Sequence, residues 1–159
     1  MENKYDFSIM RKHVVLGIPV LDNQHTHLMR ITNNLHLACL SDSKNANYRF
    51  KQAVRETVDF VRLHFKTEEK LMTLSGFPGY RDHEKEHRDF MWEILNRSEQ
   101  FQKSEEYIPQ NFVQFFRDWV EAHIGCCDKA FADFFLTMKQ NDKLRMVLAG
   151  DMQLSAQPA

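Results

Sequence analysis

The sequence predicts an all-α protein, an antiparallel up-down four-helix bundle with a short N-terminal arm and a C-terminal helical tail. Glycine and proline are scarce, at 5 and 4 of 159 residues. Long stretches without either residue carry apolar side chains at alternating spacings of three and four, which is typical of amphipathic helices. No alternating strand pattern or internal repeat appears. The length suits one domain with a real core, and short connections between long helices favour antiparallel neighbours.

Helix-breaking residues divide the chain into four helical segments, near 20–40, 46–75, 79–105 and 109–138. A polar cluster between the first two segments reads as a loop. Each segment is ~30–45 Å long at the rise of an α-helix. We therefore expect three regions, which are an N-terminal arm (1–19), the bundle (20–138) and a C-terminal extension, partly helical and then disordered (139–159).

Composition excludes several classes of protein. Lys plus Arg is 21 and Asp plus Glu is 22, so no basic excess exists to neutralise nucleic acid. No run reaches the ~18 apolar residues of a membrane span, and the first residues lack the apolar core of a signal peptide, so a cytoplasmic location is expected. The three cysteines cannot form a disulfide framework.

Polar residues interrupt the apolar faces at matching depths of the predicted bundle. Antiparallel packing brings the start of one helix to the level of the end of the next, so these side chains can meet in one buried layer. A buried imidazole or carboxylate without a partner costs several kcal/mol, so several converging ones are best explained by a bound cation. These residues are His25, His64, Glu68, His83, His87 and His123.

The fourth helix offers two further candidate ligands. Cys127 is four residues after His123 and shares its face on a regular helix. Asp128 is five residues after His123 and is rotated by ~140° unless a one-residue π-bulge realigns it. Gly125 weakens the helix between them. Apolar residues follow in phase with both candidates, so periodicity alone leaves the choice open.

Four motifs contain these polar residues: Gly17-Ile18…Asp22-Asn23-Gln24-His25, His64-Phe65-Lys66-Thr67-Glu68-Glu69, His83…His87 and Trp119…His123-Ile124…Asp128. Together, over roughly residues 16 to 138, they resemble the hemerythrin family, in its bacteriohemerythrin-like form with an HHE-type metal-binding domain. Each motif alone is weak, but the joint pattern of five histidines and two carboxylates is strong. The up-down bundles of this kind include myohemerythrin.

The resemblance implies a non-haem di-iron centre, its two irons bridged by an oxide or hydroxide, that binds dioxygen reversibly. By position, one iron would take His83, His87 and His123, the other would take His25 and His64, and Glu68 and Asp128 would bridge them. Imidazole and carboxylate suit divalent first-row metals, and seven ligands exceed what one tetrahedral zinc needs. The resemblance also favours Asp128 over Cys127 and so predicts a bulge between His123 and Asp128.

Apolar residues beside these ligands in the sequence are expected to form a dry wall around the bound dioxygen. Such a wall slows the entry of protons and the oxidation of the irons. Ordinary core packing is the alternative explanation, and the two are compatible. The residues are Leu28, Phe65, Trp119, Val120 and Ile124.

Oxygen storage or delivery is the expected function, and oxygen or redox sensing is the alternative. A sensor would transmit the iron state through the C-terminal tail to a signalling partner or output domain. Weak peroxidase or oxidase activity at the same irons is a further alternative. The segment His83-Glu84-Lys85-Glu86-His87 also matches a zinc-peptidase signature. However, its extended form would require glycine and histidine at the positions of Phe90 and Glu93, so proteolysis is disfavoured.

Some residues beside the motifs have simpler expected roles. Glu69 is expected to be a solvated neighbour or a partner that orients a ligand. Cys126 and Cys127 would be oxidation targets or, as we favour, packing residues. The histidines that fit no motif are expected on the surface, and they are His13, His27 and His36.

Overall fold

The computed structural model describes residues 15–40, 46–103 and 109–138. The expectations for His13, for most of the N-terminal arm and for the C-terminal extension lie outside these ranges. The regular secondary structure of the described residues is all helical. Its elements are α1 (Pro19–Cys39), α2 (Ala46–Ser75), α3 (Tyr80–Lys103), α4 (Pro109–His123), the π-helix η2 (Ile124–Asp128) and α5 (Lys129–Met138).

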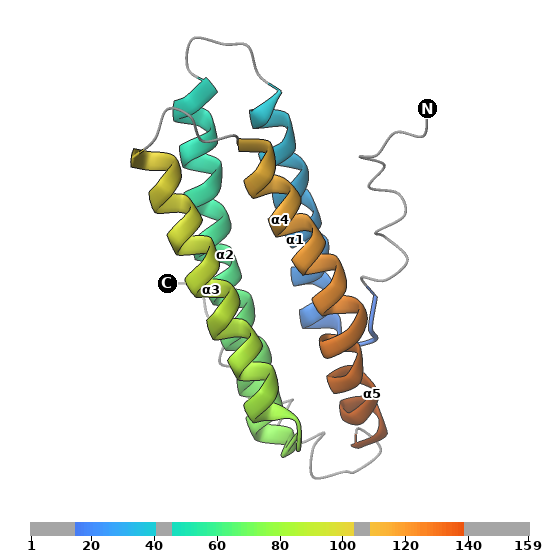
Figure 1. Ribbon diagram of the computed structural model, residues 1–159. Helices are drawn as coiled ribbons and strands as arrows, with labels where there is room; N and C mark the ends of the chain where they lie inside the picture. The colour runs from blue at the N-terminus through green and yellow to red at the C-terminus, as the bar shows by residue number, and fades with distance from the viewer. Residues whose placement is uncertain (1–14, 41–45, 104–108, 139–159) are drawn as a thin grey trace, which may run out of the picture.

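Four rods run alternately up and down, as the sequence predicts (Figure 1). The fourth rod is composite, because α4, η2 and α5 follow one another without a gap. α1 packs against α2 and α4, and α3 packs against α2 and α4. Of the described helices, none is long and apolar enough to span a membrane.

Local interactions fix the start of α1. Pro19 occupies the first turn, where a missing amide hydrogen costs nothing. The Asp22 carboxylate accepts hydrogen bonds from the amides of Leu16 at 2.7 Å and Gly17 at 3.1 Å. Gly17 has φ of +90°, and a Cβ there would lie 3.1 Å from Leu136. Glycine at this position therefore allows the incoming chain to turn close against α5.

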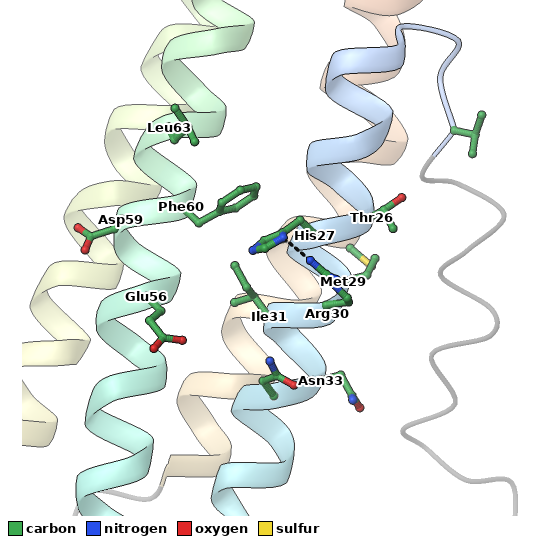
Figure 2. Close-up of a pocket in the computed structure, with 12 residues that line it drawn as sticks. Thr26, His27, Met29, Arg30, Ile31, Asn33, Glu56, Asp59, Phe60 and Leu63 are labelled. Atoms are coloured by element: carbon green, nitrogen blue, oxygen red, sulfur yellow. Dashed lines mark hydrogen bonds between the residues drawn. The ribbon is translucent and has the colours of Figure 1, made fainter. Parts of the chain in front are cut away.

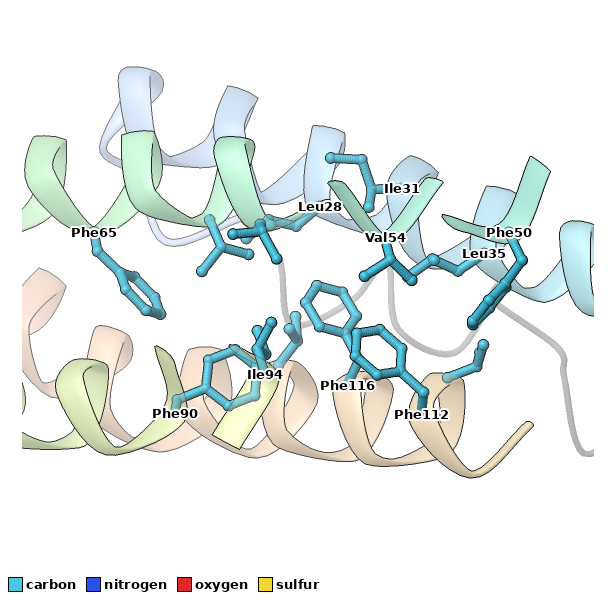
Figure 3. Packing of buried hydrophobic residues seen from close by; sticks show 14 of the residues in the cluster. Leu28, Ile31, Leu35, Phe50, Val54, Phe65, Phe90, Ile94, Phe112 and Phe116 are labelled. Carbon is cyan, nitrogen blue, oxygen red and sulfur yellow. The ribbon is translucent and has the colours of Figure 1, made fainter. Parts of the chain in front are cut away.

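Two apolar clusters fill the bundle on either side of a polar layer. The larger cluster includes Leu35, Phe50 and Phe112 and reaches Phe65 and Phe90 at its inner end (Figure 3). The smaller cluster lies toward the opposite end of the bundle and consists of Ile18, Leu21, Leu71, Met72, Phe131, Ala132 and Phe135. On each helix, the buried histidines and carboxylates fall between or beside these apolar stretches. The polar layer is thus held at a fixed depth by packing on both sides.

Candidate metal centre

All seven predicted ligands come together in the polar layer. Each is at most 4% exposed. One group combines Glu68, His83, His87, His123 and Asp128, and the other combines His25, His64 and Asp128. Within each group the candidate ligand atoms all lie within 4.8 Å of one another. Asp128 belongs to both groups, so two neighbouring positions for a metal ion share one carboxylate.

Three histidines in the first group form a tight triangle. The Nε2 atoms of His83, His87 and His123 are separated by 3.0 to 3.1 Å. Three nitrogen ligands at about 2.1 Å from one ion are about 3.0 Å apart when they meet at right angles and about 3.4 Å apart in a tetrahedron. The triangle therefore fits one face of an octahedral ion better than a tetrahedral zinc site.

Asp128 spans the two groups with separate oxygens. Its Oδ1 lies 3.2 Å from His83 Nε2 and 3.1 Å from His123 Nε2. Its Oδ2 lies 3.2 Å from His25 Nε2. Glu68 Oε2 lies 3.5 Å from the Nε2 atoms of His83 and His87, and 3.9 Å from that of His64. Asp128 therefore faces both groups with separate oxygens, whereas Glu68 belongs to the first group and approaches His64 of the second with the same oxygen.

The carboxylates of Glu68 and Asp128 accept no geometrically satisfactory hydrogen bond from the part of the chain that the structure describes. Buried ionised groups require a partner, because the cost of removing a charge from water is several kcal/mol. A cation between the carboxylates and the imidazoles would supply that partner to all of them at once. This arrangement of donors fits the metal centre that the resemblance implies.

Two hydrogen bonds define which ring nitrogen of a ligand histidine is available. His87 Nδ1 lies 2.9 Å from Glu69 Oε1, and a carboxylate only accepts, so Nδ1 carries the hydrogen. His64 Nδ1 lies 3.0 Å from Gln24 Oε1 and donates to it in the same way. In both rings the lone pair is left on Nε2, which faces the polar layer. Glu69 thus orients a ligand, and Gln24 is a partner that the sequence reasoning missed.

Opposing influences set the charges of this cluster. Burial raises the pKa of Asp128, but the close approach of His123, His25 and His83 outweighs burial and lowers it well below its ordinary value. Burial lowers the pKa of His83, but the carboxylates of Asp128 and Glu68 raise it overall to about 9. Burial lowers the pKa of His64 to about 4. Near pH 7 the layer thus keeps an anionic Asp128 and a neutral His64, both in the states that bind metals, whereas His83 must release a proton when it binds one.

The predicted bulge is confirmed. Residues Ile124–Asp128 form a π-helix in which Asp128 is fully buried. The wider turn accommodates one extra residue and returns Asp128 to the face of His123. Cys127 is half-buried and belongs to neither ligand group, and Cys126 is exposed. The structure therefore favours Asp128 over Cys127 as the candidate ligand.

A small cavity adjoins both ligand groups. Its volume is about 10 Å³, and its lining includes His64, His123 and Asp128. A cavity of this size holds about one water-sized molecule. All five predicted wall residues line it, together with two that the sequence reasoning missed, and the seven are Leu28, Phe65, Trp119, Val120, Ile124, Val61 and Phe90. The last two lie three residues from His64 and His87, a spacing that could have indicated the shared helix face.

The aromatic wall residues also hold the ligand rings. Phe65 stacks on His87, with ring centroids 3.7 Å apart and planes within 6° of parallel. Trp119 stacks on His123 at 4.1 Å, and Phe90 stacks on Trp119 at 3.6 Å. The same side chains therefore pack against the imidazole rings and also line the cavity.

A separate and more open pocket lies between α1 and α2 and involves His27 (Figure 2). His27 is partly exposed and stacks on Phe60 of α2 with ring centroids 4.1 Å apart. Arg30 Nη2 donates to its Nδ1 at 2.6 Å. His36 is also half-buried. Both histidines are thus partly exposed, and Phe60 covers part of His27.

Comparisons with known proteins agree with this geometry. Residues 16–134 match the family model described as the hemerythrin HHE cation binding domain. The chain is 31% identical over 118 residues to a bacteriohemerythrin of Stenotrophomonas maltophilia, covering 74% of each chain. It is 27% identical over 110 residues to a bacteriohemerythrin of Methylococcus capsulatus, covering 69% of this chain and 82% of that one.

The structure of the chain is also similar to that of hemerythrin. A crystal structure of wild-type hemerythrin superposes with a TM-score of 0.65 at 25% identity, over 72% of this chain and 85% of that one. The matched residues 16–134 contain every candidate ligand of the buried layer. The family match, the bundle and the cluster of histidines and carboxylates lead to one conclusion: the chain belongs to the hemerythrin family.

Proposed function

We propose that this protein holds two iron ions in the buried layer and binds dioxygen reversibly in the adjoining cavity. His83, His87 and His123 bind one ion, His25 and His64 bind the other, and Glu68 and Asp128 bridge them. The observation that carries the proposal is the position of Asp128, whose two oxygens face histidines of different groups at 3.1 to 3.2 Å.

The number of ligands leaves room for one small molecule. Five histidines would each make one bond, and Glu68 and Asp128, if both bridge, would each make two. With one bridging oxide or hydroxide, two six-coordinate ions would be left one bond short. The cavity of about 10 Å³ lies beside His64, His123 and Asp128 and so adjoins both positions. When bound, the two irons would supply the electrons that hold dioxygen and recover them on its release.

The protein side chains control what else reaches the cavity. Val120 and Ile124 are 2% and 3% exposed and present only hydrocarbon to it. Water and protons that enter such a site promote the irreversible loss of electrons from the metal, so a dry wall prolongs reversible binding. The proposal concerns oxygen binding itself, which storage, delivery and sensing all require.

Iron loading without air, followed by cycles of air and argon, tests the proposal. We expect two irons per chain and a visible absorption band that appears in air and disappears under argon. His27→Ala is a suitable control, because His27 lines the separate pocket and should leave the band unchanged. Binding of a single zinc ion with no iron, or a band that argon never removes, would contradict reversible oxygen binding.

A further inference from the structure

The two candidate metal positions differ in the groups that accept a hydrogen bond from Nδ1 of a ligand histidine, the ring nitrogen that faces away from the polar layer. At one position, His87 Nδ1 donates to the carboxylate of Glu69 at 2.9 Å. At the other, His64 Nδ1 donates to the amide oxygen of Gln24 at 3.0 Å. One ligand histidine is therefore paired with a negative charge, and the other with a neutral group.

A chain of hydrogen bonds fixes the neutral partner. Gln24 Nε2 donates to Thr67 Oγ1 at 3.1 Å, and Thr67 Oγ1 donates to the backbone oxygen of Leu63 at 2.9 Å. Because the Thr67 hydroxyl has already given its hydrogen to Leu63, it accepts from Gln24, and the amide oxygen of Gln24 must face His64. This arrangement links α1 to α2 and carries no net charge.

The charged partner lies at the edge of the buried layer. Glu69 is 26% exposed on its side chain, whereas His87 is 1% exposed. Phe65 covers one face of the His87 ring, so water screens the interaction weakly. A carboxylate that accepts the Nδ1 hydrogen of a metal-binding histidine makes the ring a stronger electron donor. A neutral amide in the same position has a smaller effect.

We infer that Glu69 and Gln24 make the two iron positions unequal, so that the ion held by His87 retains its ferric state more firmly than the ion held by His64. Both residues act through a ligand and are positioning residues. The inference rests on the proposed function for the identity of the metal. It further implies that the two ions accept their single electrons at separate potentials.

Exchanging charge and amide tests the inference. In Glu69→Gln, the His87 position should become easier to reduce, and in Gln24→Glu, the His64 position should become harder to reduce. A reductive titration under argon, followed by visible absorption, measures both potentials. Glu86→Gln is the matched control, because it removes an exposed negative charge one residue from His87. Shifts of the same sign in the first two variants, or a shift in Glu69→Gln no larger than in Glu86→Gln, would overturn the inference.

Cobalt binding to the metal-free protein gives a second reading that does not depend on iron or oxygen. We expect Glu69→Gln to weaken the affinity for Co²⁺ by about 10- to 100-fold at one of two positions. Equal weakening at both positions would indicate a general loss of structure and would contradict the inference. If cobalt shows two unequal positions but iron-loaded protein binds no oxygen, the proposed function fails while the inequality stands.

Discussion

Leu28→Ala separates the role of the cavity wall in stability from its role in protecting the metal centre. Leu28 is 3% exposed, belongs to the larger apolar cluster and lines the cavity beside the ligands. Removing a buried leucine side chain lowers the free energy of unfolding by about 3–5 kcal/mol, and the cost within this range rises by about 24 cal/mol for each Å³ of cavity that remains. The existing cavity of about 10 Å³ changes this cost by only about 0.2 kcal/mol.

Leu35→Ala provides the control, because Leu35 is fully buried on the same helix and in the same cluster but does not line the cavity. Urea unfolding should therefore give similar losses for the two variants. The enlarged cavity of Leu28→Ala, however, adjoins polar ligands and admits water. We expect its oxygen-dependent absorption band to decay several-fold faster in air than that of Leu35→Ala. Equal decay rates at equal loss of stability would refute the argument that Leu28 keeps the site dry.

Three further predictions concern the ligands and the bulge. Asp128→Ala should reduce the bound iron to at most one ion per chain, whereas Cys127→Ser should keep two. Elemental analysis of the purified variants measures the iron content. Loss of iron in Cys127→Ser but not in Asp128→Ala would reverse the ligand assignment. Folded His64 stays neutral down to a pKa of about 4, but the unfolded chain binds a proton near pH 6.5. The metal-free protein should therefore lose up to about 3 kcal/mol of unfolding free energy as pH falls from 6.5 to 4. The same measurement on His64→Leu should show a smaller loss, and an unchanged slope would disprove this origin. Gly125→Ala should raise the free energy of unfolding, measured by urea titration, by about 1 kcal/mol, because nothing lies within 4 Å of the added Cβ. A lower free energy of unfolding would show that the π-helix needs glycine.

Residue spacings within single helices were sufficient to predict most of the fold and of the candidate site. Spacings of four, as in His64 with Glu68 and His83 with His87, place side chains on one face whatever the rest of the chain does. The bounds of α2 agree with the predicted 46–75 for the same reason. The choice between Cys127 and Asp128 required the family resemblance, because both possible faces of α5 are apolar.

Features that depend on the packing of two helices were harder to predict. The partnership of Gln24 with His64 joins residues 40 positions apart, and it depends on the relative rotation and height of α1 and α2. The stacking of His27 on Phe60 depends on the same packing. Neither residue stands out by its own spacing, since side-chain partners across helices are set by the register of the bundle rather than by the sequence of either helix.

Anomalous X-ray diffraction at the iron absorption edge, from crystals of the iron-loaded protein, tests the central claim most directly. The proposal predicts two iron peaks in the buried layer, one beside His83, His87 and His123 and the other beside His25 and His64, with Asp128 between them. A single peak, or iron bound only outside this layer, would contradict it.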